Sequence, residues 1–353
     1  MAQGEDPHAA PRDAEPEMQE GDVLACAFGS WYETFRRLTF KSDVIALPED
    51  FVKFLSADGI RALGRGRGGG PDAASSSCSW HSGASDSASD AGSSGGAADE
   101  EEEEEGGFPE LEARIKASIE RLGGEVLPKL NWSAPKDAQW LHGSLKCTSV
   151  DEVITMLKAS DFVAHDLCHS FEHCATDRTR PDHFTLVLRR WHDVYESSEF
   201  RCFVSDSVLF AVSQRHTSSL FEHLGRQDET APIKCEIAAF FDENIRMAFP
   251  LRRYAFDVCV GAAPQRRVRL VDFSPWGPTT DPCLFDWPEL AELARESEDA
   301  AVEFRVVREE SDRRAKAERY SQLPLELAQL SMGEGIEELL GKADSLLAEK
   351  ARH

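Results

Sequence analysis

Apolar residues recur at helical spacing in several parts of the chain. In residues 108–122 they form one stripe, and a Gly-Gly pair follows as a stop signal. A second helix is predicted after Ser149, which has an N-cap residue type and is followed three residues later by a glutamate. A third is predicted over residues 233–249. The tail beyond Trp287 is predicted to contain two more, the second within residues 336–347.

Runs rich in β-branched and aromatic residues predict strands between these helices. Residues 125–132, 161–167 and 184–191 are predicted to be extended. Two hairpins are predicted, one over residues 199–215 around a Ser-Asp-Ser turn and one over residues 253–276 around the loop GAAPQRR. Antiparallel hairpins mixed with packed helices are typical of an α+β fold.

An aromatic stripe near the start of the chain allows two interpretations. Phe28, Trp31, Tyr32 and Phe35 recur at helical spacing, and the helix is predicted to end before a short apolar run at residues 44–47. The stripe either faces the core or forms an exposed surface that binds a partner.

Two segments have a composition that predicts disorder. Residues 1–20 are acidic and rich in Pro and Ala, and residues 64–107 are rich in Gly, Ser, Ala and Asp and contain the acidic run Asp99 to Glu105. Such segments cannot bury enough apolar surface to offset the entropy lost on ordering. The second is an acidic insertion that divides the chain, either as a solubilising spacer or as an electrostatic contact for a basic partner.

Composition and charge narrow the functional classes. The 353 residues are 41% hydrophobic, enough for a sizeable core. No apolar run approaches the roughly 18 residues that would cross a membrane, and the acidic N-terminus has no signal-peptide core, so a soluble protein without membrane association is expected. Nine cysteines without paired spacing favour the reducing cytoplasm. A net charge of −25 argues against direct nucleic-acid binding.

The second hairpin carries the strongest chemical signal. Strand alternation in VRLVDFSPW predicts Val268, Leu270, Asp272 and Ser274 on one face, with the intervening residues on the other. Folding the hairpin brings Asp257 to within about one residue of lying opposite Asp272.

Two carboxylates this close repel each other, so we expect a cation between them. Hard oxygen ligands suit Mg²⁺, which commonly bridges to nucleotide phosphates. The alternatives are that one carboxylate faces solvent or that Asp272 caps the turn after Pro275.

Basic residues on other predicted strands could meet phosphates. Lys129, Lys136, Arg189 and Arg201 are candidates, and Lys129 and Arg201 are the strongest because their neighbours are apolar and an unpaired buried charge is costly. P-loop, dinucleotide and nucleophile-elbow motifs are missing from the sequence. The His/Cys-rich residues 165–174 have no second ligand cluster, which argues against a zinc site.

Several strings in collinear order resemble a known family. PKLNWSAPKDAQW, SLKC, LVLRRW, EFRCFV, SQR and VDFSPWG followed by TD closely resemble the eukaryotic cell division cycle protein 123 family, and residues 31–55 and 320–340 resemble its flanking segments. The resemblance implies an ATP-grasp fold that holds Mg²⁺ and ATP between two lobes. It also implies a chaperone that assembles translation initiation factor 2 by binding its gamma subunit.

The resemblance also implies a domain division and a set of site residues. Residues 21–63 and 108–190 would form the first lobe, 191–290 the nucleotide- and metal-binding lobe and 291–353 a C-terminal helical segment. The ATP-binding residues would be Lys129, Trp132, Ala134, Leu188, Arg189, Arg201, Asp257 and Asp272.

The same resemblance assigns Asp257, Asp272 and Ser274 as metal ligands, and Trp31, Tyr32 and Phe35 as candidates for partner contact. Ser274 stands where the family usually has Asn. Because a hydroxyl reaches less far than an amide oxygen, weaker Mg²⁺ binding is expected.

Two other functions remain open. An ATP-grasp ligase would activate a carboxylate as an acyl phosphate, but nothing in the sequence singles out an acceptor pocket. A protein-binding scaffold with a vestigial nucleotide site would be consistent with Ser274. The resemblance favours a chaperone over an enzyme.

Overall fold

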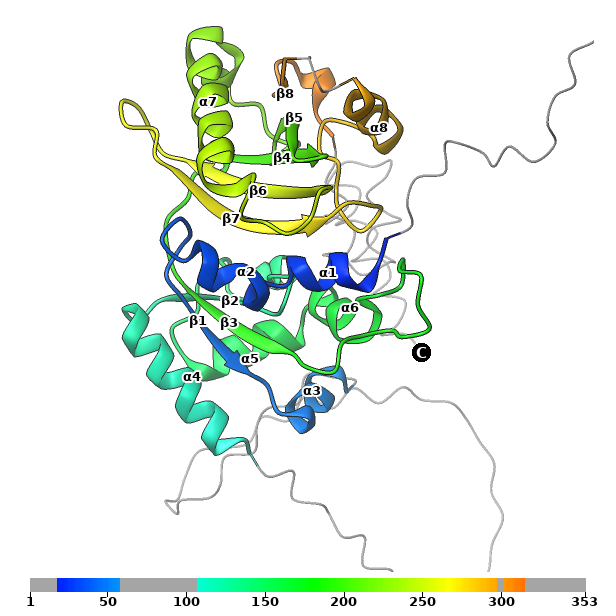
Figure 1. Cartoon of the computed structure of the whole chain (residues 1–353). Coiled ribbons are helices and arrows are strands. Elements are labelled where there is room, and N and C mark those ends of the chain that lie inside the picture. Colours follow the sequence, from blue (N-terminus) through cyan, green and yellow to red (C-terminus); the bar gives the residue numbers. More distant parts are fainter. Residues whose placement is uncertain (1–17, 58–106, 297–300, 315–353) are drawn as a thin grey trace, which may run out of the picture.

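The computed structural model describes residues 18–57, 107–296 and 301–314. These residues form two β-sheets, each with its own helices, stacked as two lobes (Figure 1). Helices α1 (Glu20–Cys26) and α2 (Phe28–Phe35) lie between the lobes. The mixed α+β, two-lobed architecture with antiparallel hairpins is therefore confirmed.

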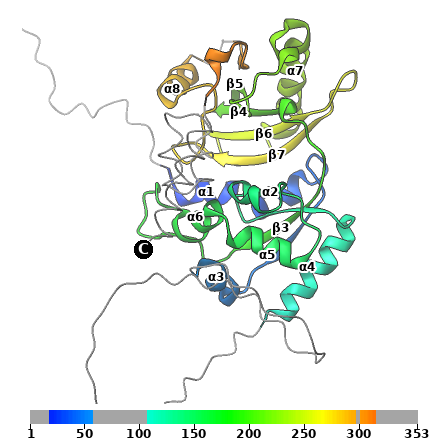
Figure 2. The same ribbon diagram turned by 180° about the vertical axis from the view of Figure 1, so that it is seen from behind.

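The first lobe has a three-stranded antiparallel sheet in the order β1-β3-β2. Seen from behind, α4 and α5 lie in front of β3 and cover one face of this sheet (Figure 2). Its strands are β1 (Ser42–Ala46), β2 (Val126–Lys129) and β3 (Thr185–Arg190). Its helices are α3 (Glu49–Ser56), α4 (Pro109–Leu122), α5 (Val150–Lys158) and α6 (Asp161–His169).

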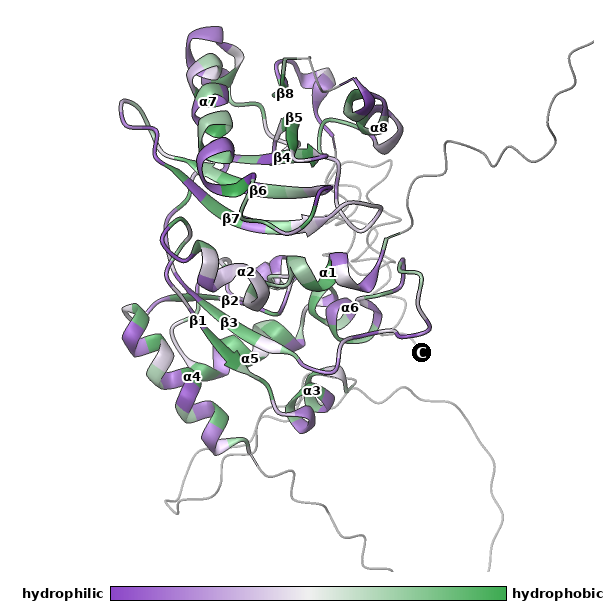
Figure 3. Ribbon diagram, viewed as in Figure 1, coloured by the Kyte–Doolittle hydropathy of each residue, from purple (hydrophilic) through white to green (hydrophobic). Residues whose placement is uncertain are grey.

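Local signals explain α4 and α5. Pro109 occupies the first turn of α4, and Gly123 ends the helix in the left-handed conformation, with φ 104°. The alternation of hydrophilic and hydrophobic residues along α4 is visible in Figure 3, as expected for a helix that covers a sheet. In α5, the Ser149 hydroxyl accepts a hydrogen bond from the Glu152 backbone N at 3.2 Å. Both predicted helices are confirmed.

Residues 161–167, predicted as a strand, form helix α6 instead. The Ser160 hydroxyl caps the helix by accepting from the Val163 backbone N at 3.2 Å. The Asp137 carboxylate accepts from the backbone N of Asp161 at 2.6 Å. Capping by a distant carboxylate therefore overrides the β propensity of this segment.

The second lobe has a five-stranded sheet in the order β7-β6-β4-β5-β8, in which only the β5–β8 pair is parallel. Both predicted hairpins are confirmed. The strands are β4 (Glu199–Ser205), β5 (Val208–Gln214), β6 (Tyr254–Val260), β7 (Val268–Pro275) and β8 (Glu303–Arg305). Short 3-10 helices occur at Lys136–Leu141, Glu196–Ser198, Glu222–Gly225 and Glu310–Asp312.

Helices cover both faces of this sheet. Helix α7 (Gln227–Phe240), with a π-helical turn (Phe241–Ile245), lies on one face, and α8 (Trp287–Arg295) packs against the other. Helix α7 was predicted to begin at residue 233, directly after Pro232. It begins six residues earlier, and Pro232 lies inside it. Acidic residues in its first turn complement the helix dipole.

The aromatic stripe of α2 belongs to the core. Trp31 and Phe35 are each only 2% exposed, and their rings lie 5.3 and 5.4 Å from that of Phe273 on β7. Tyr32 is half-buried, and its hydroxyl donates to the Ser42 backbone O at 2.8 Å. The core interpretation is confirmed, and Trp31 and Phe35 do not form an exposed contact surface.

Several expectations lie outside the described residues. These are residues 1–17, almost all of the predicted insertion at 64–107, and the tail helix at 336–347. None of the helices in the described ranges has the length and apolar character that a membrane-spanning segment requires.

Candidate functional site

The carboxylates of the second hairpin lie directly opposite each other, because Asp257 on β6 pairs with Asp272 on β7. The next pair is Val258 with Leu270, so Val271 is an extra residue, a β-bulge. The bulge turns Leu270 into the core, whereas Asp272 faces the other side of the sheet. The expected placement of Leu270 and Asp272 on one face is therefore wrong.

Each carboxylate is neutralised by a basic side chain of the chain itself. Lys129 Nζ forms an ion pair with Asp272 Oδ2. Arg201 binds Asp257 in bidentate fashion, with Nε to Oδ1 and Nη2 to Oδ2 both at 2.8 Å. The side chains of Lys129 and Arg201 are only 2% and 6% exposed. The argument that only a bound cation could keep both carboxylates ionised is wrong, since these two side chains supply the charge.

The electrostatics of the pairs follow from burial and partner charge. Burial raises the pKa of Asp257, but the adjacent guanidiniums of Arg201 and Arg215 outweigh it and bring that pKa down to about 2. Burial lowers the pKa of Lys129, and the nearby Asp272 carboxylate opposes this effect. Asp257 is consequently an anion at neutral pH.

Two basic residues of the first lobe reach into the second. Lys129 ends β2 opposite Val187, and Arg189 lies two residues further along β3, so both side chains share the sheet face that carries α2. Arg189 Nη2 donates to the backbone O of Val271 at 2.7 Å. The intervening Leu188 packs its side chain into the core on the opposite face of the sheet. Of the predicted site residues on β3, the structure brings only the side chain of Arg189 to the interface between the lobes.

The loop after β2 is held by a buried carboxylate that the sequence did not reveal. Asp166 on α6, only 5% exposed, accepts hydrogen bonds from the Ser133 backbone N and hydroxyl, both at 2.8 Å. Burial raises the pKa of Asp166 to about 6, against the effect of the Ser133 bonds and Lys129. Trp132, in the same loop, donates from Nε1 to the Val23 backbone O at 2.8 Å. Ala134 follows Ser133 and is half-buried.

Two further residues of the site were missed. Arg215, just after β5, has Nε 3.5 Å from Asp257 Oδ2 and Nη1 3.1 Å from Asp281 Oδ2. The backbone O of Asp281 accepts from Arg201 Nη1 at 2.8 Å. Arg215 and Asp281 are 66 residues apart. Each lies in a string that resembles the family, SQR and TD, and that resemblance is the signal that could have found them.

The remaining metal candidate, Ser274, lies one pleat beyond Asp272 on the same face, opposite Ala255. Asp257, Asp272 and Ser274 offer only hard oxygen atoms, which fits Mg²⁺. Within the described residues, no group of three His, Cys, Asp or Glu side chains is placed to hold a metal ion. The His/Cys-rich residues 165–174 lie in the C-terminal part of α6 and in the turn that follows it.

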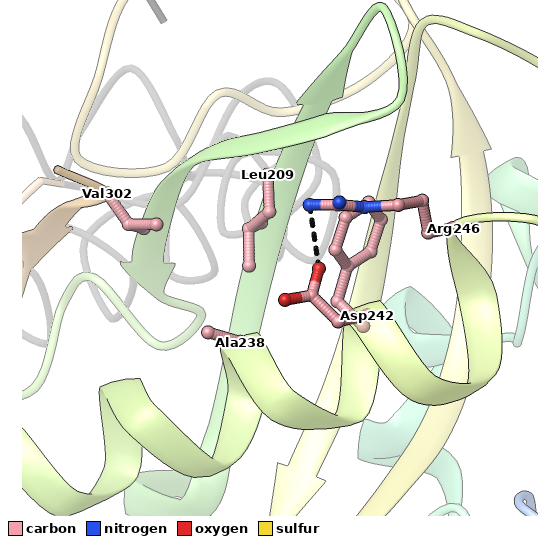
Figure 4. Close-up of a pocket in the computed structure, with 6 residues that line it drawn as sticks. Leu209, Ala238, Asp242, Arg246 and Val302 are labelled. Atoms are coloured by element: carbon pink, nitrogen blue, oxygen red, sulfur yellow. Dashed lines mark ion pairs between the residues drawn. The ribbon is translucent and has the colours of Figure 1, made fainter. Parts of the chain in front are cut away.

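A small crevice of about 70 Å³ on the second lobe is separate from these residues (Figure 4). It lies beside α7, where Arg246 pairs with Asp242 at 2.7 Å. It contains none of the predicted site residues.

Comparisons with known proteins give consistent results. The family model D123 matches residues 31–331. A Xenopus laevis protein named translation initiation factor eIF2 assembly protein is 34% identical over 337 residues, which cover 92% of this chain and 95% of the relative. A Danio rerio protein of the same name is 38% identical over 276 residues, covering 77% and 76%. The structure of Cdc123 from Schizosaccharomyces pombe is similar, with a TM-score of 0.64, 34% identity and coverage of 82% and 98%.

Proposed function

The chain belongs to the D123 family, and from this premise we propose that it binds Mg²⁺ and ATP between its lobes and assists the assembly of translation initiation factor eIF2. The assembly role is supported by relatives named eIF2 assembly protein that match nearly the whole chain. The ATP-grasp character and the nucleotide are part of the proposal.

One observation supports the proposed nucleotide site most directly. Two opposed carboxylates and three basic side chains, contributed by both lobes, converge around β6 and β7. Burying this much charge is costly and does little for stability, so a binding role explains it better than a structural one. The carboxylates are Asp257 and Asp272, and the basic residues are Lys129, Arg189 and Arg201.

Different residues of the chain would hold the metal ion, contact the phosphates and fix the loop after β2. When bound, Mg²⁺ would neutralise negative charge on phosphate oxygens, held by Asp257, Asp272 and the Ser274 hydroxyl. Lys129 and Arg201, now paired with these carboxylates, are positioned to transfer part of their interaction to phosphate oxygens. The Asp166 carboxylate keeps the loop with Trp132 and Ala134 in place. For Leu188, only the backbone is a candidate for contact.

The partner is proposed to be the gamma subunit of eIF2. Of the three aromatic candidates for contact, only the half-buried Tyr32 offers any surface. Because all eight cysteines in the described residues are free thiols, we place the protein in the reducing cytoplasm.

Isothermal titration of ATP, with and without Mg²⁺, tests the site. Asp257→Asn removes a metal ligand but preserves shape, so binding should depend on Mg²⁺ in the wild type and be lost in the variant. Asp242→Asn, in the crevice of Figure 4, is the matched control and should bind as the wild type does. Thermal unfolding of each variant checks that it is folded.

Reconstitution of eIF2 from its subunits tests the assembly role separately. Asp257→Asn should slow the joining of the gamma subunit to the others, and normal assembly by a variant that binds no nucleotide would refute the requirement for ATP. ADP release driven by a small carboxylic acid and an amine would instead indicate a ligase.

A further inference from the structure

A second concave site lies on the side of the second lobe where the linker joins the lobes. It is a groove of about 530 Å³, bounded by linker residues 192–198, the N-terminal half of α7 and the tip of the β6–β7 hairpin at residues 261–267. Figure 1 shows this hairpin tip, in yellow, projecting beside α7. None of the predicted nucleotide or metal residues lines it. We call it the linker groove.

The floor of the linker groove is apolar. Phe200, Leu224, Ile233 and Val260, which come from four different elements, meet there at the edge of the second-lobe core. On the rim, Tyr195 is 80% exposed. A groove of this volume with an apolar floor is suited to one or two apolar side chains, and tyrosine is among the residue types enriched in binding hot spots.

The rim of the linker groove is basic although the whole chain has a net charge of −25. Arg266, Arg267 and Arg269 follow the hairpin tip into β7. Arg266 is paired with Glu229 at 2.7 Å, whereas the Arg269 guanidinium lies 5.4 Å from the centre of the Phe40 ring. Arg267 is exposed.

The pKa of a histidine in the groove lining is consistent with a basic rim. The pKa of His192, also in the lining, is lowered by burial and then by the arginines Arg269, Arg190 and Arg189. Asp193 acts on this pKa in the opposite direction but less strongly than the arginines, so the potential at His192 is positive.

We propose that the linker groove binds a short peptide segment of a partner protein in which an apolar side chain is flanked by Asp or Glu residues. The apolar floor takes the side chain, and the arginine rim attracts the flanking carboxylates. A nucleic acid fits less well, because the apolar floor offers no partner to a phosphate backbone and the chain as a whole carries a net charge of −25. This binding is independent of the proposed nucleotide site.

Fluorescence polarisation on the full chain provides the test. The probe is a fluorescein-labelled peptide of sequence EDLFDE, with KKLFKK and EDSGDE as controls for charge and for the apolar anchor. Only EDLFDE should bind at micromolar concentrations, and added salt should weaken it. Arg267→Glu and Tyr195→Ala, both at exposed positions, should each weaken binding about tenfold.

Two control variants isolate the groove. Arg252→Glu changes the same charge at an arginine that pairs with Asp206 outside the groove lining, and it should bind as the wild type does. Asp257→Asn should also bind normally, so failure of the nucleotide proposal would leave this one standing. Absence of EDLFDE binding at millimolar concentration, equal binding of KKLFKK, indifference to Arg267→Glu, or displacement of the probe by oligouridine RNA would each overturn the proposal.

Discussion

Replacing Asp166 by asparagine tests how a buried carboxylate holds the loop of the candidate site. Ser133 donates two hydrogen bonds to Asp166, one to each carboxylate oxygen. An amide keeps one acceptor but turns an NH₂ group toward the other donor, so Asp166→Asn should cost about 1–3 kcal/mol of unfolding free energy at pH 7.

The pH dependence of this cost has a definite sign. Because burial raises the folded-state pKa of Asp166 to about 6 from the ordinary 3.8, the folded protein binds a proton that the unfolded chain does not between these values. The resulting stabilisation is fully present below pH 3.8 and is lost as the pH rises through 6. Lowering the pH from 7 to 5 should therefore stabilise the wild type by about 1.3 kcal/mol relative to Asp166→Asn.

Urea unfolding of both proteins at pH 7, 6 and 5 measures this difference. The destabilisation caused by Asp166→Asn should grow as the pH falls, while Asp242→Asn, which removes an exposed ion pair, should stay within about 0.5 kcal/mol of the wild type. A destabilisation by Asp166→Asn that is the same at all three pH values would refute the reasoning.

Two further predictions concern the carboxylates directly. Lys129→Met leaves the Asp272 carboxylate without its partner and should lower the unfolding free energy by about 3 kcal/mol. Adding Asp272→Asn to this variant should restore much of the lost stability. A double variant that is no more stable than Lys129→Met in urea unfolding would contradict the pairing. Ser274→Asn extends an oxygen donor toward the same face and should tighten Mg²⁺ binding in calorimetric titration, with equal or weaker binding as the contrary result.

The parts of the fold that were predicted correctly depend on local signals. The caps of α4 and α5 and the two hairpins are specified within a few residues, so their sequences suffice. Helix α6 was missed because its N-terminus is capped in part by Asp137, which lies 24 residues earlier.

The opposition of Asp257 and Asp272 could be predicted from hairpin geometry, but their partners could not. Lys129 is 143 residues from Asp272, and the two meet only after the lobes have packed. The bulge at Val271 could not be predicted from the sequence either, because the residue types around it are those of an ordinary strand.

The bulge makes the number of residues in β7 as important as their identity. Deleting Val271 would restore regular alternation: Asp272 would follow Leu270 at once, stay opposite Asp257 and keep facing away from the core, with Phe273 still inside it. One missing residue would thus leave the two carboxylates opposed, but it would remove the Val271 carbonyl to which Arg189 of the first lobe donates. In this family, an alignment gap at the bulge position should therefore coincide with loss of this arginine–carbonyl contact, and so report on how the two lobes are joined.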